Sequence, residues 1–183
     1  MTKRLMSSTL LIAGLLLTGG CSEQDAPTIL PGPVALTEEA LGHYCNMNLL
    51  EHTGPKAQIH LKGIQHPVWF SQVRDAIAYT RLPEETQEPA SIYVNDMGRA
   101  TNWDRPGNDT WIDINKAFFV IGSKRAGGMG APEAIPFGSK DQAESFSVLH
   151  GGDVRLLAAI PDAYVLGPVD PDFQSNMITG ETE

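Results

Sequence analysis

The sequence is poor in features that mark several common functions. Lysine and arginine number 13 against 22 aspartates and glutamates, which gives a formal net charge of −9, and they form no long basic run. Neutralising phosphates needs clustered cations, so we expect no nucleic acid partner. The sequence also contains no glycine-rich phosphate loop, nucleophile elbow or paired-carboxylate motif. Without these motifs the sequence does not indicate a common enzyme class, so individual reactive side chains carry the remaining evidence for function.

A second absence is an apolar run long enough to cross a membrane. The apolar stretch Leu10–Leu17 is short, follows a positively charged start and precedes Thr18-Gly19-Gly20-Cys21. This order is typical of a bacterial lipoprotein signal, although Thr18 stands where leucine is usual. We therefore predict a signal peptide over residues 1–20 and lipidation of Cys21. Acyl chains would anchor the protein to the membrane on its periplasmic side. Ser22, and not aspartate, follows the cysteine, which looks like the sorting pattern of Gram-negative lipoproteins of the outer membrane. We therefore expect the anchor to lie in the outer membrane.

Cysteine is scarce too, because Cys21 and Cys45 are the only two. Two cysteines in an oxidising compartment usually form a disulfide. If Cys21 carries lipid, this disulfide cannot form, and Cys45 is left as a thiol exposed to oxidation. Metal binding and catalysis are the two usual reasons for keeping such a thiol.

The remaining sequence indicates one α+β domain. Residues 21–38 are rich in proline and predict a tether, residues 39–170 form the predicted domain, and residues 171–183 form an acidic tail. Apolar runs and helical spacing predict two similar ββαβ units within the domain. The first comprises strands 57–61, 68–70 and 91–95 with a helix over 71–81. The second comprises strands 117–122, 134–137 and 154–158 with a helix over 139–150, where Ser139 and Gln142 fit a capping box and Gly151 ends the helix.

The densest group of reactive side chains lies in the segment His43-Tyr44-Cys45-Asn46-Met47-Asn48-Leu49-Leu50-Glu51-His52. A thiolate and a thioether are soft ligands that favour Cu(I), and they do not form a structural zinc set. Residues two apart share one side only in an extended or turned segment, which the asparagine-rich sequence allows. His43 has the same parity as Cys45, and His52 could fold back toward it.

Two further methionines are candidate ligands. Met129 lies in Gly127-Gly128-Met129-Gly130, where glycines leave its sulfur uncovered. Met97 lies on a predicted turn at Asn95-Asp96-Met97-Gly98. The sequence therefore predicts a metal site at Cys45, Met47 and Met129, and leaves open whether His43, His52, Met97 or a partner residue completes it.

The segments HYCNMNLLEHTGPKAQI, IYVNDMGRA, AFFVIGSKRAGGMGAPEAIPFGS and HGGDV resemble the nitrous oxide reductase accessory proteins of the NosL type. The similarity covers about residues 43–155. It implies a Cu(I) chaperone that delivers copper for the multi-copper centres of nitrous oxide reductase. It also implies collaboration with an ABC-type transporter complex and its periplasmic subunit, and a fold similar to organomercurial lyase.

The resemblance places the family's ligands on Cys45, Met47 and Met129. Many relatives have a second cysteine in the early segment, whereas Tyr44 and Asn46 flank Cys45 here, so a dithiolate site is not expected. The chaperone hypothesis implies a protein that is not an enzyme. Two alternatives remain: a thiol-dependent enzyme with Cys45 as nucleophile, and an interaction lipoprotein that binds no metal.

Overall fold

The structure is a computed structural model that describes residues 30–170 and residue 173. The predicted signal peptide, Cys21 and nearly all of the predicted tail lie outside these residues. The described chain forms, in order, the 3₁₀ helix η1 (Leu49–Glu51), β1 (Ala57–Leu61), β2 (Val68–Phe70), α1 (Val73–Tyr79), β3 (Pro89–Asn95), β4 (Trp111–Asp113), η2 (Ile114–Lys116), β5 (Phe118–Ile121), β6 (Ile135–Phe137), α2 (Lys140–His150), β7 (Asp153–Leu156), η3 (Leu157–Ala159) and α3 (Asp162–Leu166).

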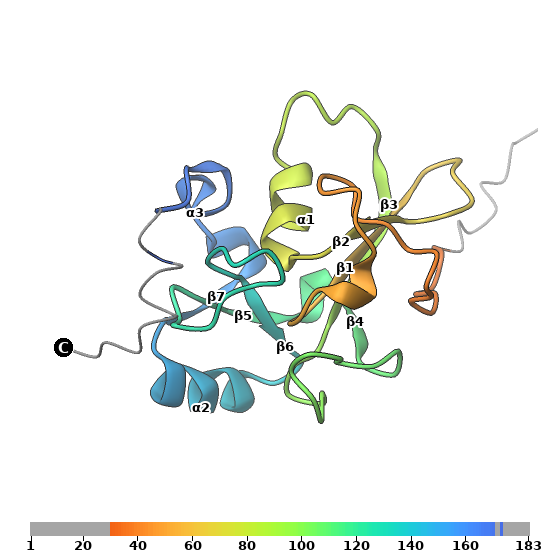
Figure 1. Cartoon of the computed structure of the whole chain (residues 1–183). Helices are drawn as coiled ribbons and strands as arrows, with labels where there is room; N and C mark the ends of the chain where they lie inside the picture. Colours follow the sequence, from red (N-terminus) through yellow and green to blue (C-terminus); the bar gives the residue numbers. More distant parts are fainter. Residues whose placement is uncertain (1–29, 171–172, 174–183) are drawn as a thin grey trace, which may run out of the picture.

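The strands form two small antiparallel sheets (Figure 1). The first has the order β2-β1-β3-β4, and Ala57 of its inner strand β1 pairs with Phe70 on one side and Val94 on the other. The second has the order β6-β5-β7, and Phe118 pairs with Phe137 and Leu156. The chain therefore runs β1-β2-α1-β3 and then β5-β6-α2-β7, which confirms the prediction of two ββαβ units in an α+β fold.

The predicted boundaries are close for the strands and too wide for the first helix. Strands β1 and β2 have the predicted limits, but α1 begins at Val73 because Gln72 is still extended, with φ −136° and ψ 140°. The predicted capping box before α2 does not form. Ser139 makes no side-chain capping bond, and Gln142 Nε2 instead donates to the carbonyl oxygen of Gly98 at 3.0 Å. The helix ends at Gly151, with φ 73°, as predicted.

Two apolar clusters hold the units together. The larger cluster joins side chains of β1, β3, α1, β5 and α3, including the fully buried Ile59, Ile77 and Phe119. The smaller cluster packs Ala143 of α2 against β5 and β6. Since α1 belongs to the larger cluster, its first residues have a fixed position between the two units. None of the described helices combines the length and the apolar sequence that crossing a membrane requires.

Residues 30–38, the second part of the predicted tether, lie against the first sheet. Ser91 Oγ and Tyr93 Oη both donate to the carbonyl oxygen of Pro31, at 2.7 and 2.8 Å. Val34 and Gln58 exchange two hydrogen bonds of 2.8 and 3.0 Å. These contacts fix this part of the segment on β1 and β3, and all five residues of β1 are buried.

Candidate metal centre

The segment that carries Cys45 forms a tight loop. Gly42 N donates to Met47 O at 2.9 Å, and Asn46 N donates back to Gly42 O at 2.7 Å. Asn46 has φ 53°, in the left-handed region that asparagine tolerates better than most residues. A Cβ atom at residue 42 would collide with Cys45 Sγ, so the glycine allows the thiol to fold over the loop.

The Cys45 thiol is free, half-buried and directed at the start of α1. Its sulfur lies 3.8 Å from Ser71 Oγ, and Ser71 is buried two residues before the helix. Met47, at the other end of the loop, is 40% exposed. A hydroxyl is no general base, so this contact gives Cys45 none of the activation that a nucleophile needs.

The glycine-rich segment around Met129 reaches the same place from the second unit. Met129 N donates to Gln72 Oε1 at 3.0 Å, and the Met129 side chain is 40% exposed. A Cβ atom at Gly128 would lie 2.7 Å from Ser71 O and 2.9 Å from His52 Cβ. The backbone of this segment therefore packs directly on Ser71.

Two consecutive residues, Ser71 and Gln72, thus connect the two sulfur-bearing segments. Ser71 contacts Cys45 through its hydroxyl and Gly128 through its carbonyl, and Gln72 holds the Met129 backbone. The structure brings the Cys45 loop and the Met129 segment together at the start of α1, although 84 residues separate them in the sequence.

His52 borders this cluster with a defined tautomer. His52 Nδ1 lies 3.0 Å from the carbonyl oxygen of Gly128. A carbonyl can only accept, so Nδ1 carries the proton and the neutral ring has a lone pair at Nε2. Nε2 is buried and has no hydrogen-bond partner. Metal-binding histidines commonly donate their other ring N–H to a backbone carbonyl in this way.

Glu133 ties the second unit to the start of α1. Its carboxylate accepts hydrogen bonds from Val73 N at 3.3 Å and from Arg74 N and Ala134 N, each at 2.8 Å. Burial raises the pKa of Glu133 to about 8. A Cβ atom at Gly127 would lie 2.5 Å from Glu133 Oε2, so the glycine-rich segment packs on this carboxyl group.

The NosL family model matches residues 33–165, which is most of the chain. The chain belongs to the NosL family.

Two relatives and one solved structure agree with this assignment. The chain is 56% identical over 162 residues to the copper-binding lipoprotein NosL of Achromobacter cycloclastes, covering 88% of this chain and 83% of that protein. It is 32% identical over 156 residues to the copper-binding lipoprotein NosL of Stutzerimonas stutzeri, covering 84% and 80%. It also matches the crystal structure of the copper chaperone NosL from Shewanella denitrificans with a TM-score of 0.65 at 28% identity, covering 72% of this chain and 97% of that one.

Two side chains left open as further ligands have other neighbours in this NosL family member. His43 Nε2 lies 3.3 Å from Glu85 Oε1, and its ring packs against Tyr44, Phe70 and Tyr79. Met97 is partly buried against the smaller apolar cluster. Within residues 30–170 and 173, no three His, Cys, Asp or Glu side chains are grouped to hold a metal ion.

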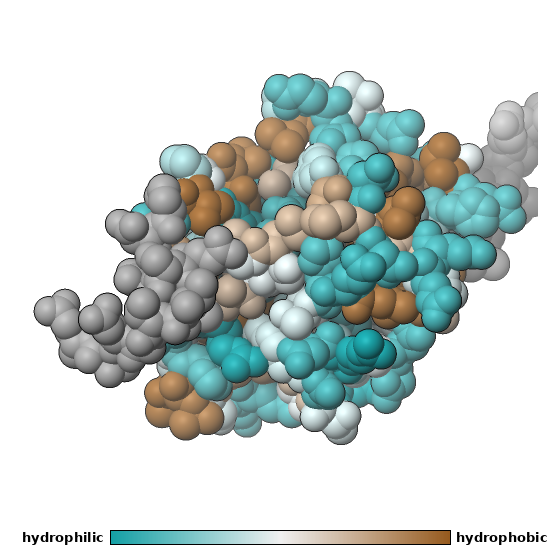
Figure 2. Space-filling view, in the orientation of Figure 1, coloured by the Kyte–Doolittle hydropathy of each residue, from teal (hydrophilic) through white to brown (hydrophobic). Residues whose placement is uncertain are grey.

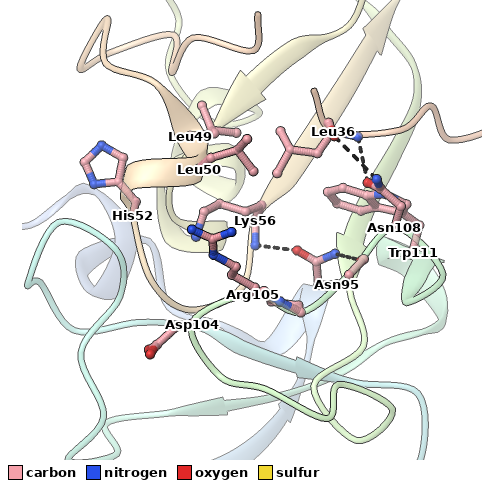
Figure 3. A pocket seen from close by; sticks show the side chains of 12 residues that line it. Leu36, Leu49, Leu50, His52, Lys56, Asn95, Asp104, Arg105, Asn108 and Trp111 are labelled. Atoms are coloured by element: carbon pink, nitrogen blue, oxygen red, sulfur yellow. Dashed lines mark hydrogen bonds between the residues drawn. The ribbon is translucent and has the colours of Figure 1, made fainter. Parts of the chain in front are cut away.

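A cavity of about 100 Å³ lies beside η1, and none of the three predicted sulfur ligands lines it (Figure 3). Lys56 and Trp111 form part of its wall. Lys56 is 2% exposed and its Nζ donates to the carbonyl oxygens of Thr53 and Gly54 at 2.8 and 2.6 Å, while burial lowers its pKa to about 8. Trp111 Nε1 is buried without a hydrogen-bond partner.

Sequence reasoning missed the residues that position the candidate site. Ser71 and Gln72 were assigned to a helix, and Glu133 was not singled out. The available signal was weak: Glu133 is the one charged residue in the run Ala131-Pro132-Glu133-Ala134-Ile135-Pro136-Phe137. Burial of a charged residue usually requires hydrogen bonds, which here come from α1.

Proposed function

We propose that this NosL family member is a periplasmic chaperone that binds one Cu(I) through Cys45, Met47 and Met129 and transfers it to a copper enzyme. The observation that carries the proposal is the meeting of the Cys45 loop and the Met129 segment at Ser71 and Gln72. The names of the relatives, a copper-binding lipoprotein and a copper chaperone, support it.

The chemistry of the side chains favours Cu(I) over harder ions. One thiolate and two thioethers form a soft ligand set. His52 Nε2 is our candidate for the nitrogen ligand, because its lone pair is free and the Gly128 carbonyl fixes its ring. Met47 and Met129 are each 40% exposed, so an incoming ligand from another protein could reach the ion before these thioethers leave it.

The recipient and the location follow from the family resemblance. We infer that the copper is delivered to the multi-copper centres of nitrous oxide reductase, together with an ABC-type transporter complex and its periplasmic subunit. Acylation of Cys21 would hold the chaperone on the outer membrane, where its domain faces the periplasm. The relatives named as lipoproteins support the anchor.

A Cu(I) titration against a competing chelator tests the binding proposal. We expect one Cu(I) per chain, loss of binding in Cys45→Ala and strong weakening in Met47→Ala. Met97→Leu is the matched control, because it removes a thioether from the apolar cluster with little change in volume. X-ray absorption would count sulfur and nitrogen ligands. Unchanged affinity in both Cys45→Ala and Met47→Ala would overturn the proposal.

A further inference from the structure

Exposed apolar side chains surround the loop that carries Cys45. Leu41, Tyr44 and Met47 on the loop are 50%, 48% and 40% exposed, and Met129 from the adjoining segment is 40% exposed. Figure 2 shows hydrophobic side chains lying next to hydrophilic ones on the face in view. Large apolar side chains gathered at one place and rimmed by polar groups mark a contact surface.

Acidic groups lie next to these apolar side chains. Glu85 Oε1 accepts the hydroxyl of Tyr44 at 3.0 Å. The backbone oxygen of Glu38 accepts Asn48 Nδ2 at 2.6 Å, and Glu51 N donates to the backbone oxygen of Asn48 at 3.2 Å. The side chains of Glu38 and Glu51 belong to exposed residues. These contacts place the Glu85 carboxylate and the backbones of Glu38 and Glu51 next to the loop.

No lysine or arginine accompanies Glu38 and Glu51 within the same stretch of sequence, and Glu85 Oε1 lies 3.3 Å from His43 Nε2. Residues 37–55 contain glutamates and no lysine or arginine. The next residue, Lys56, is 2% exposed and donates to backbone oxygens of the chain itself. The surface made by Leu41, Tyr44, Met47 and Met129 with Glu38, Glu51 and Glu85, here called the loop face, therefore combines exposed apolar side chains with acidic residues.

We propose that the loop face docks on a protein surface whose own contact area is ringed by lysine or arginine. The inference rests on the proposed function, since the partner would be the protein that exchanges copper with Cys45. Complementary charge steers two proteins into contact and suppresses wrong pairings. A second copy of this chain would set glutamates against glutamates, and an anionic membrane would be repelled for the same reason. A basic protein surface is the occupant that the charges select.

Transfer kinetics to synthetic acceptors test the proposal. The probes are two dithiol peptides of equal length, one flanked by lysines and one by glutamates, offered to the Cu(I)-loaded protein in a stopped-flow instrument. At low salt we expect transfer to the lysine-flanked acceptor to be about 10-fold faster or more. The two rates should converge at about 0.5 M salt, where screening removes steering.

Matched variants separate the loop face from the net charge of the protein. The test variant combines Glu38→Gln, Glu51→Gln and Glu85→Gln, and the control combines Asp141→Asn, Glu144→Gln and Asp153→Asn on α2 and β7. Both change the charge by the same amount. We expect the test variant to lower the rate ratio several-fold with unchanged Cu(I) affinity, and the control to leave the ratio near that of the parent protein. Equal effects in both variants, or no preference between the acceptors, would overturn the proposal.

A metal-free measurement keeps this inference separate from the proposed function. A lysine-rich peptide without thiols is titrated into the apoprotein and followed by backbone NMR. Shift changes confined to the loop face and lost in the test variant support the docking surface even if copper binding fails. Shifts spread over the surface, or concentration-dependent self-association through the loop face, would contradict it.

Discussion

We expect a single methyl group added at Gly128 to push apart the two halves of the candidate site, which are the Cys45 loop and the Met129 segment. A Cβ there would lie 2.7 Å from Ser71 O, 2.9 Å from Thr53 O and 2.9 Å from His52 Cβ. Two of these neighbours are backbone oxygens in ordered parts of the chain, so they cannot rotate away. The φ of Gly128 lies outside the left-handed region, and Gly128→Ala therefore tests the clash without adding backbone strain.

The cost of this substitution can be bounded in two ways. If the segment stays in place, overpacking of this kind costs about 1–3 kcal/mol. If the segment moves away, it loses the hydrogen bonds from His52 to Gly128 and from Met129 to Gln72, each contributing about 0.5–1.5 kcal/mol. Both routes give a loss of about 1–3 kcal/mol. A loss of about 2 kcal/mol would lower the melting temperature by about 4–8 °C.

The loss of copper affinity should be about as large, in free energy, as the loss of stability. Displacing the segment moves Met129 and releases the His52 ring, and loss of such supporting contacts weakens metal binding by about 10- to 100-fold. Gly32→Ala is the control, because nothing lies within 4 Å of its Cβ position and its φ is not positive. Both variants share the same reduction in unfolded-chain entropy. Equal melting temperatures and equal Cu(I) affinities in the two variants would refute the reasoning.

Two further predictions concern buried polar groups. Burial raises the pKa of Glu133 from 4.5 to about 8, so in this interval the folded state binds a proton that the unfolded state lacks, and stability falls as pH rises. Urea unfolding at pH 5, 6.5 and 8 should show a smaller decline for Glu133→Gln than for the parent, and equal declines would contradict it. Trp111→Phe removes a buried N–H without a partner, so thermal unfolding should show a neutral or stabilising effect; a loss above about 2 kcal/mol would indicate that Trp111 Nε1 has a role.

The parts of the fold that were predictable from the sequence are those set by local pattern. Strand β1 is an apolar run bounded by turn residues, and α2 shows helical spacing ended by glycine. Strand β4 was missed because Trp111–Asp113 has three residues and owes its state to pairing with β3. The capping box at Ser139 failed because Gln142 found a partner in the loop at Gly98, a contact distant in sequence.

The candidate site, too, has one part that local sequence predicts and one part that depends on contacts distant in sequence. Cys45 and Met47 could be singled out locally, since a lone thiol beside a thioether is unusual in this chain. The spacing left open whether His43 points to the same side as Cys45, and in the structure the segment turns at Asn46 and His43 Nε2 lies 3.3 Å from Glu85 Oε1. Which other side chains approach Cys45 depends on packing between units, so sequence spacing carried no information about it.

The candidate site lies where the two ββαβ units meet, so it cannot be recognised from the sequence of either unit alone. The Cys45 loop precedes the first unit, and the Met129 segment lies between β5 and β6 of the second. They meet at the start of α1, where Ser71 contacts both Cys45 and Gly128 and Gln72 accepts the Met129 N–H. Glu133 in turn accepts Arg74 N of the same helix. An ion held by Cys45 and Met129 would therefore bridge the two units. A change in the packing of α1 against Glu133 would then alter the positions of both ligands.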